Sequence, residues 1–405
     1  MTKYGRSPWL DQFPKSRVPS YPRYRGKTQS DVVIVGGGLT GCATAYAFAA
    51  AGVKVVLLEA DRIGRGATVA ASGWIATDPG VPFAQLEKLV GLRAARRAWQ
   101  AWRRAGLDFA ALLRRLDLKC ALETQDGVLV ARSPEEGARL KKEQKARVAA
   151  GLETPLLTAR AIRSEFGLDG VAALRAKDGG TIDPYRACVG LAGAAASRNA
   201  QLCERSRVRR VTFTRKTADV HLQDGVIRTN RVLVTTSMPT QLVRGLIRHF
   251  WFKTCNLVLT EPVPAKIRRQ LGTARAVVRD LAEPPHVIRR VGEDRLLIAG
   301  ADSEAVPPRQ RDKVVVQRTG QLMYELSTLY PDISGIQPAY GWMADYALTA
   351  EGIPYIGPHR NYPHHLFAFG DASHSVTGAY LASRVLLRQH LGEAESPDDA
   401  FSFNR

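Results

Sequence analysis

The sequence predicts an α/β fold in which a domain with a parallel sheet is interleaved with an α+β domain built on an antiparallel sheet. The run DVVIVGGG, from Asp31, has the continuous apolar character of a buried parallel strand and ends in glycines. An alanine-rich, helix-prone segment follows and stops at Gly52, and VKVVLLEA then predicts a second buried strand. Further runs within 251–302 alternate as antiparallel strands do. Strand, glycine turn, helix and strand together indicate a Rossmann-like domain of the three-layer ββα type.

Changes of pattern along the chain set the expected domain limits. Residues 1–29 contain four prolines without periodicity, so we expect an extended arm there. The other expected segments are 30–82, 150–240 and 335–393 for the nucleotide-binding domain, 83–149 and 241–334 for the second domain, and 394–405 for a C-terminal tail. The expected elements are a mainly helical, basic region over 83–150, several strands with an Asp-Gly hairpin over 205–236, and helices over 309–331 and 373–392.

Composition bounds the class of protein. The 405 residues are 45% hydrophobic, which is ample for a packed core. No apolar run reaches the roughly 18 residues of a transmembrane helix, and the start lacks the apolar core of a secretory signal, so a cytoplasmic protein is expected. The cysteines are scattered without a CxxC pair, which predicts buried thiols rather than a disulfide framework or a zinc site, and no metal is expected. They are Cys42, Cys120, Cys188, Cys203 and Cys255.

The net charge of +20 and the pI of about 10.1 raise the question of an anionic partner. Many of the arginines within 93–115 alternate with Ala, Trp and Leu at helical periods, which favours the solvated faces of amphipathic helices. A nucleic acid, a membrane surface or an acidic substrate stays open as the alternative, with nucleic acid not favoured.

The glycine turn carries the first functional motif. Gly36, Gly38 and Gly41 form G-x-G-x-x-G between a strand and a helix, where they permit the tight turn, the approach to a pyrophosphate and close helix packing. The helix N-terminus then offers N–H groups and partial positive charge to the phosphates. Glu59 ends the second strand and can accept hydrogen bonds from ribose hydroxyls. The sequence therefore predicts a bound dinucleotide.

Several stretches resemble, in order, the flavoprotein oxidases of the D-amino-acid oxidase superfamily. The resemblance covers residues 28–392 and is nearest to the branch with glycine, sarcosine and gamma-glutamylputrescine oxidases. The stretches are Asp31–Glu59, RIGRGAT (62–68), DGGTIDPY (178–185), Val232–Thr236, RLLIAGAD (295–302), GIPYIGP (352–358) and Phe369–Arg384. FAD is therefore the cofactor that the resemblance implies.

The resemblance also implies which residues contact FAD. Non-covalent binding is expected, because no histidine precedes His221 and no cysteine follows Cys255, so the family's early histidyl and late cysteinyl linkages are excluded. The chain departs from the family pattern at Ser72 and at Ser375, where glycine is usual beside the isoalloxazine ring. The expected contacts are Gly36, Gly38, Leu39, Thr40, Gly41, Glu59, Ala60, Arg65, Gly66, Ala67, Thr68, Val208, Thr236, Gly370, Ser375, Val376 and Thr377.

The chemistry implied by the resemblance is oxidation of a C–H bond next to nitrogen, with hydride transfer to flavin N5. The expected substrate is a small amine or amino acid, and the electron acceptor is oxygen or a quinone or carrier protein. Two alternatives stay open: a flavoprotein acting on modified tRNA, as in one branch of the superfamily, and a flavin-binding protein silenced by its two serine substitutions.

Substrate contacts follow from the same resemblance. Arg290 lies nearest the family's carboxylate-binding arginine in its strand and is preferred to Arg289, and His374 matches a residue that often faces the substrate. D-amino-acid oxidases carry Arg-Pro near the place of Asp345-Tyr346, which leaves room for an amine or a cationic substrate. The expected aromatic pocket walls are Tyr340, Trp342 and Tyr346.

Overall fold

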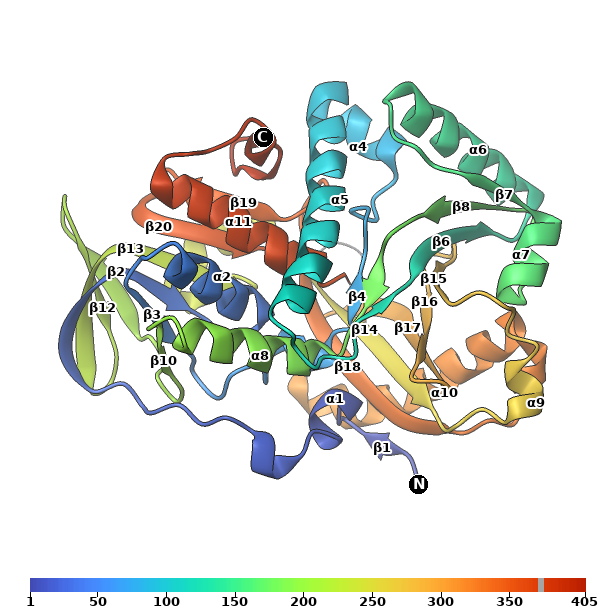
Figure 1. Cartoon of the computed structure of the whole chain (residues 1–405), viewed down its shortest axis with the longest axis horizontal. Coiled ribbons are helices and arrows are strands. Elements are labelled where there is room, and N and C mark those ends of the chain that lie inside the picture. Colours follow the sequence, from blue (N-terminus) through green and yellow to red (C-terminus); the bar gives the residue numbers. More distant parts are fainter. Residues whose placement is uncertain (371–374) are drawn as a thin grey trace.

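A computed structural model describes residues 1–370 and 375–405 and divides them between two large sheets that lie side by side (Figure 1). One sheet has eight strands and the other has nine. A small three-stranded sheet lies where the chain passes between them. Its strands are β4 (Trp74–Ile75), β9 (Gly180–Thr181) and β5 (Glu123–Thr124).

The eight-stranded sheet is parallel at its centre and branches at its longest strand. The first part of this strand pairs with an antiparallel hairpin, and its last part pairs with a parallel strand from near the C-terminus. The sheet order is β10 (Gln201–Cys203), β3 (Val55–Leu58), β2 (Gly26–Val35), β13 (Gly225–Ser237), β12 (Ala218–His221) and β11 (Arg210–Phe213), with β20 (Tyr362–Phe369) and β19 (Tyr355–His359) branching from β13.

Both faces of the central strand β2 are buried, as the continuous apolar run predicts. Val32 and Ile34 pack under three helices on one face, while Val33 and Val35 pack with Phe367 and its neighbours on the other. The covering helices are α2 (Leu39–Ala50), α8 (Pro184–Ala196) and α11 (Thr377–Leu391). The predicted Rossmann-like strand, turn, helix and strand are confirmed.

The nine-stranded sheet is mostly antiparallel, as the alternating runs within 251–302 predict. Ile288 and Ile298 pack under helix α10 (Arg311–Leu329), while Val287 and Leu297 face the cofactor-binding side with Trp74. The sheet order is β1 (Lys3–Tyr4), β18 (Pro338–Leu348), β14 (Trp251–Thr260), β17 (Arg295–Glu304), β16 (Val287–Val291), β15 (Ala276–Arg279), β6 (Asp126–Ala131), β8 (Ala172–Ala176) and β7 (Leu156–Thr158).

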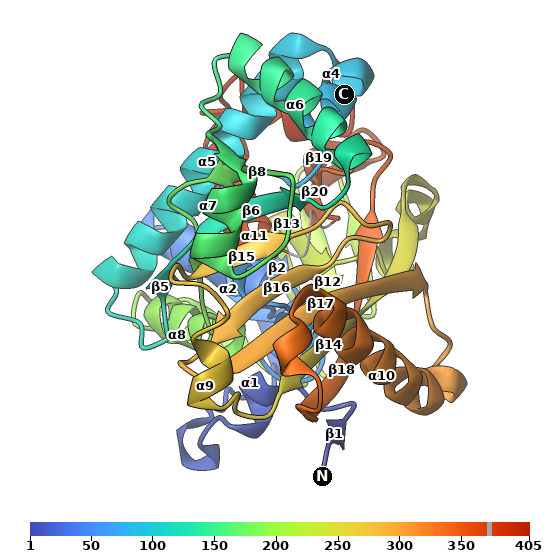
Figure 2. The same cartoon turned by 90° about the vertical axis from the view of Figure 1, so that its right-hand side faces the viewer.

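The remaining helices connect and cover the two sheets. In both views, α4, the start of α5 and α6 lie at one end of the molecule (Figures 1 and 2). The α-helices are α1 (Pro8–Asp11), α3 (Ala67–Ala70), α4 (Phe83–Val90), α5 (Leu92–Arg115), α6 (Pro134–Ala149), α7 (Ala159–Phe166) and α9 (Ala265–Arg268). The 3-10 turns are η1 (Lys15–Arg17), η2 (Gln241–His249), η3 (Pro308–Gln310), η4 (Pro331–Ile333) and η5 (Asp398–Phe401).

Sheet membership departs from the expected domain limits in three places. Strands β7 and β8 fall in the predicted segment 150–240, and β18 in 335–393, yet all three pair within the nine-stranded sheet. An apolar alternation predicts a strand but does not select its partner, which decides the domain. The helical prediction for 83–150 also missed β5 and β6, which are short strands between long helices.

The N-terminal arm is docked on the body of the protein. Strand β1 pairs with β18 in parallel, and Trp9 of α1 is buried and donates from Nε1 to the Ala71 carbonyl at 2.9 Å. The extended arm predicted from the prolines therefore contains a short strand and a helical turn, and β2 already begins at Gly26.

In the described part of the chain, no helix is both long enough and apolar enough to pass through a membrane. All five cysteines are buried, as expected for packing thiols. The cytoplasmic location stays a prediction.

His286 links two acidic side chains behind the nine-stranded sheet. Its Nδ1 lies 2.7 Å from Asp280 Oδ2, and its Nε2 lies 2.8 Å from Glu325 Oε2 on α10. Burial disfavours the charged ring, but the hydrogen bonds and charges of Asp280 and Glu325 outweigh it, so the pKa of His286 is raised.

We therefore expect His286 to stabilise the fold below the ordinary histidine pKa of about 6.5, with the contribution lost as pH rises through the raised pKa. The thermal unfolding midpoint of the wild type should fall over that range more steeply than that of His286→Gln. His221→Gln, in the other sheet, is the control and should keep the wild-type slope. An unchanged slope in His286→Gln would contradict this assignment.

Candidate functional site

The turn after β2 brings backbone and helix very close together. Gly36 has φ +109°, which favours glycine, and a Cβ at Gly41 would lie 1.8 Å from the Gly36 carbonyl oxygen. Gly38 caps helix α2 without any side-chain hydrogen bond. Thr68 accepts the Leu39 N–H, and the other backbone N–H groups at this end of α2 face the space in front of the turn, where they attract an anion.

Glu59 follows strand β3 and supports the same turn. Its Oε2 accepts from the Gly37 N–H at 2.7 Å, and its Oε1 accepts from the Asp61 N–H at 2.8 Å. A carboxylate has further lone pairs beyond these two bonds, which suits it to accept from a ribose hydroxyl as well.

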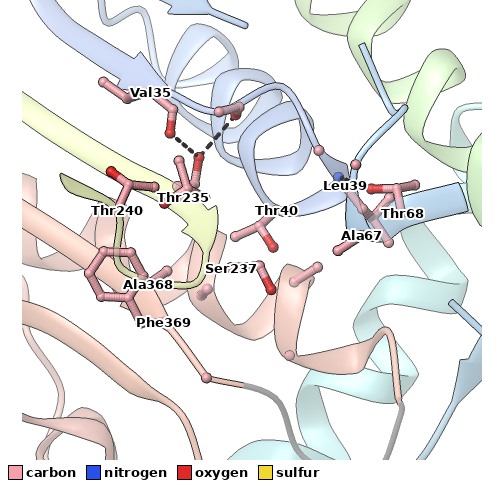
Figure 3. Close-up of a pocket in the computed structure, with 18 of the residues that line it drawn as sticks. Val35, Leu39, Thr40, Ala67, Thr68, Thr235, Ser237, Thr240, Ala368 and Phe369 are labelled. Carbon is pink, nitrogen blue, oxygen red and sulfur yellow. Dashed lines mark hydrogen bonds between the residues drawn. The ribbon is translucent and has the colours of Figure 1, made fainter. Parts of the chain in front are cut away.

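A cavity of about 670 Å³ lies in front of the turn and runs between it and a second loop, residues 66–68 (Figure 3). Thr68 of the second loop accepts the Leu39 N–H on its hydroxyl at 2.8 Å, which ties that loop to the start of α2. The cavity brings together most of the predicted cofactor residues, although their contact with FAD stays a prediction. Those on its wall are Gly36, Gly38, Leu39, Thr40, Glu59, Ala60, Gly66, Ala67, Thr68, Val208, Thr236, Gly370, Ser375 and Val376.

Three predicted cofactor residues do not line the cavity. Gly41 lies behind the turn, where its missing side chain allows the close approach to Gly36. Arg65 is exposed, and the hydroxyl of Thr377 donates to the Ala76 carbonyl at 2.8 Å. Gly41 and Thr377 therefore support the wall of the cavity from behind, and Arg65 lies outside it.

Other residues on the wall were missed from the sequence. Four of those named below lie directly beside a predicted position, so the signal that could have found them is the end of a buried strand, where such sites form. They include Thr235, Ser237, Thr240, Gln241, Arg207, Arg209, Trp102, Pro354 and Ala368.

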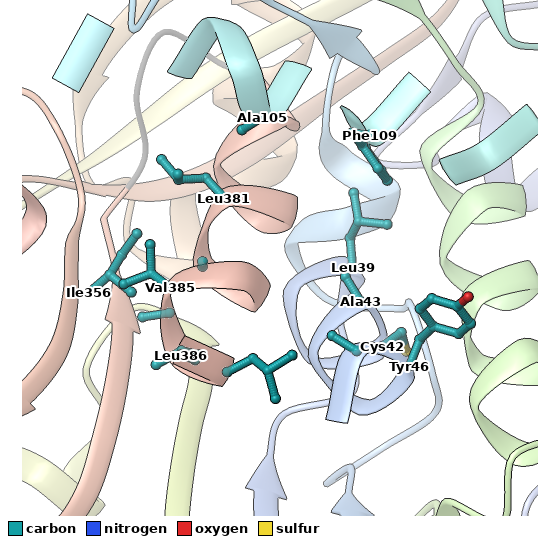
Figure 4. Packing of buried hydrophobic residues seen from close by; sticks show 14 of the residues in the cluster. Leu39, Cys42, Ala43, Tyr46, Ala105, Phe109, Ile356, Leu381, Val385 and Leu386 are labelled. Carbon is teal, nitrogen blue, oxygen red and sulfur yellow. The ribbon is translucent and has the colours of Figure 1, made fainter. Parts of the chain in front are cut away.

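Two helix N-termini face this cavity, those of α2 and α11. The two helices pack against each other, and α5 packs against α11, through Leu39, Ala43, Phe109, Leu381 and Val385 (Figure 4). Their partial positive charges would favour the pyrophosphate at one end and the electron-rich edge of a reduced ring at the other.

Ser375 departs from the family pattern without leaving its hydroxyl free to perturb the cavity. Its Oγ accepts the Ala76 N–H at 3.1 Å and donates to the Trp74 carbonyl at 3.2 Å. The hydroxyl thus ties strand β4 to the start of α11, which is a structural use of the substituted side chain.

Three consecutive carbonyls beside the cavity are each held by a buried donor from a different element. The Ala70 carbonyl accepts from Trp342 Nε1 at 3.1 Å, and the Ala71 carbonyl accepts from Trp9 Nε1 at 2.9 Å. The Ser72 carbonyl accepts from Arg289 Nε at 2.7 Å. We call residues 70–72 the clamped segment. Its position depends on the arm, on β16 and on β18 together.

The structure corrects the preference for Arg290 over Arg289. Arg290 donates to the Leu271 and Gly272 carbonyls and lines a surface hollow apart from the cofactor cavity. Arg289 is on the opposite, cofactor-facing side of β16 and is buried, 5.2 Å from the Trp9 ring. Burial lowers the pKa of Arg289 to about 10, so it is still charged at neutral pH. Side chains alternate between the faces of a strand, so these two adjacent arginines lie on opposite faces of β16.

A small chamber of about 50 Å³ adjoins the cofactor cavity and shares four wall residues with it. Its other wall comes from β14 and β18 and carries Asp345 and Tyr346, of which Tyr346 was predicted. Asp345 pairs with Arg311 and accepts from Thr254 Oγ1 at 2.8 Å, and Tyr346 donates to Asp302. The shared residues are Ala67, Ala71, Ser237 and Ser375.

Two of the other predicted substrate residues lie away from this chamber. Tyr340 donates to Asp11 Oδ2 at 2.9 Å under the arm, and Trp342 supports the clamped segment. Their roles as pocket walls are therefore not supported. His374 lies outside the described residues.

The cradle fits FAD on its own geometry. The glycine turn admits no Cβ at Gly41, an open helix end faces the cavity, and Glu59 stands at the end of β3. A second loop, at 66–68, closes the far side of a cavity of dinucleotide size. These features define a dinucleotide-binding flavoprotein.

Comparison with known proteins identifies the family. The chain matches the DAO family, described as FAD dependent oxidoreductase, over residues 31–389, and it belongs to that family. Gamma-glutamylputrescine oxidoreductase of Escherichia coli (strain K12) is 27% identical over 372 residues, covering 91% of this chain and 85% of the relative. The protein is therefore an FAD-dependent oxidoreductase.

Solved structures share the fold. Glycine oxidase from Geobacillus kaustophilus has a TM-score of 0.71 at 20% identity, covering 91% of this chain and 96% of that one. L-amino acid deaminase from Proteus myxofaciens has a TM-score of 0.77 at 16% identity, covering 100% and 99%.

Gly41→Ala should abolish FAD retention, because its Cβ would meet the Gly36 carbonyl at 1.8 Å. The measurement is the flavin absorbance per purified chain. Gly193→Ala, in α8 with nothing within 4 Å, is the matched control and should keep its full flavin content. Equal flavin content in both variants would contradict the role of Gly41.

Arg289→Met should destabilise the holoenzyme by about 2–4 kcal/mol, because it leaves two buried carbonyls without their charged donor. Arg290→Met changes the neighbouring residue on the opposite face and should leave flavin content and kcat/KM nearly unchanged. Thermal unfolding followed by flavin release measures the stability of both variants, and steady-state kinetics measures kcat/KM. A larger loss of stability in Arg290→Met than in Arg289→Met would contradict the structural role given to Arg289.

Proposed function

We propose that this oxidoreductase oxidises the C–H bond next to the nitrogen of a small amine or amino acid and releases an imine. When bound, FAD supplies the hydride acceptor at its N5 atom. The names of related proteins support this substrate class, since they include gamma-glutamylputrescine oxidoreductase, glycine oxidase, L-proline dehydrogenase and L-amino acid deaminase.

The chamber beside the cofactor cavity is the observation that carries the proposal. It adjoins the clamped segment and Ser375, where the resemblance places the flavin ring, and its volume suits one small group. Cys255, Leu257 and Ala344 add apolar wall, which excludes water from the bond that reacts.

Asp345 favours an amine over a carboxylate at this position. Among the described residues on the chamber wall there is no arginine, lysine or histidine, and Asp345 is the charged one. Its carboxylate already has Arg311 and Thr254 as partners, and an ammonium group could share it. We propose that Asp345 orients the nitrogen of the substrate.

The two alternative functions have weaker support. A tRNA-acting flavoprotein would use the net charge of +20, but the described wall of the chamber carries the acidic Asp345 and no basic side chain that would attract a phosphate. A silent flavin-binding protein would follow if Ser375 blocked the ring, and its hydroxyl is instead engaged with Trp74 and Ala76.

An anaerobic screen tests the proposed reaction. Purified protein should be yellow, and an amine or amino acid substrate should bleach the visible flavin band. Admitting oxygen should then restore the band and yield peroxide, as proposed for an oxidase. A band that returns only with a quinone would make the protein a dehydrogenase. Absence of bleaching with every compound would contradict the proposal.

Asp345→Asn should lower kcat/KM for the amine by about 30-fold, the equivalent of about 2 kcal/mol for a charged hydrogen bond, mainly through KM. Asp312→Asn removes the same charge from the exposed side of α10 and is the control, with kcat/KM expected within about twofold of wild type. An equal effect in both variants would show that only the overall charge matters.

A further inference from the structure

One end of the molecule is built from the C-terminus of α4, the N-terminus of α5 and the C-terminus of α6, and both views show these helices together (Figures 1 and 2). Helix α4 packs against both α5 and α6. A Cβ at Gly151, just after α6, would lie 3.4 Å from Arg96 Nη2 of α5. We call this region the α4–α6 end and define it by residues 88–97 and 141–151.

Large aliphatic side chains are exposed at the α4–α6 end. Leu89 is 53% exposed, Leu92 is 51% exposed and Val148 is 55% exposed. Val90, between the two leucines, packs inward against the main core, so the turn at Gly91 leaves its neighbours outside. Single exposed aliphatic residues are ordinary, but these three lie one on each of the helices that meet at this end, and we call them the apolar tip.

Basic side chains lie on the same three helices as the apolar tip. They are exposed, and none makes an ion pair with another described residue. The nearby acid Glu143 is buried against Arg147 and main-chain N–H groups, so it does not offset their charge at the surface. The basic residues are Lys88, Arg93, Arg96, Lys141, Lys142 and Lys145.

We propose that the α4–α6 end docks on an anionic lipid surface. Unpaired cations attract the headgroups, and the aliphatic tip enters the boundary between headgroups and acyl chains. A nucleic acid would use the same cations but would gain little from exposed leucines, because its phosphate backbone is polar. Since no described helix can cross a membrane, the contact is peripheral.

The contact would also place the cofactor near the membrane. Helix α5 begins at Leu92, in the apolar tip. Ten residues later in the same helix, Trp102 lies on the wall of the cofactor cavity. Ten residues of helix span about 15 Å. A surface-bound molecule would thus hold its flavin site a short helix away from the lipid.

Sedimentation of the holoenzyme with vesicles tests the proposal. The protein should sediment with vesicles of phosphatidylcholine and phosphatidylglycerol. Far less protein should sediment with vesicles of pure phosphatidylcholine. Affinity should fall as salt rises. Failure to bind either vesicle would overturn the proposal.

Two double variants, each at two exposed residues, separate the apolar and the basic contributions to vesicle binding. Leu89→Ser with Leu92→Ser should weaken binding at least about tenfold, and Lys88→Gln with Arg93→Gln should weaken it about 30-fold. Arg215→Gln with Lys216→Gln removes equal charge from the β11–β12 turn, in the eight-stranded sheet, and should retain wild-type binding. Flavin content and thermal midpoint, measured for each variant, report folding.

Three other results with these variants would contradict membrane docking. Equal loss in the control pair would show diffuse attraction by net charge and overturn the proposal. Unchanged affinity for the vesicles in the Leu89→Ser with Leu92→Ser variant would also overturn the proposal. Tighter binding to tRNA than to vesicles, weakened by the Lys88 and Arg93 changes alone, would assign the basic end to nucleic acid instead.

Discussion

The approach of helix α2 to the end of strand β2 is the constraint on which the site depends. With no side chain at Gly41, the helix backbone reaches the Gly36 carbonyl, and the open helix end then points into the cavity. Glu59 and Thr68 fix the same turn from β3 and from the second loop. A few hydrogen bonds thus align two segments that would face the two phosphates.

The cofactor half of the site could be predicted from sequence because its determinants are local. A glycine pattern, a buried strand and an acidic strand end lie within 31–59, and short-range geometry fixes how they meet. Fourteen of the seventeen predicted contacts line the cavity, and the other three lie behind or beyond its wall. Ser375 could not be interpreted from sequence, because its partners, Trp74 and Ala76, are 301 and 299 residues away in the chain.

The substrate side of the site depends on which face of a strand each side chain occupies and on which strands pair across the chain. Sequence reasoning does not determine either. Arg289 and Arg290 are adjacent, yet one supports the clamped segment and the other reaches a distant surface. The strand prediction was right and the choice of face was wrong. Likewise β18 was recognised only as part of the cofactor domain, although it supplies Asp345 and Tyr346 to the chamber from the other sheet.

The docked arm has a consequence for how the protein is made. Thr2, beside strand β1, bonds to Pro338, 336 residues later in the chain, and Trp9 of the same arm donates to the carbonyl of Ala71. The arm can close on β18 only after residues 338–348 have been translated. Completion of the flavin pocket therefore comes long after its glycine turn, at residues 36–41, has been synthesised.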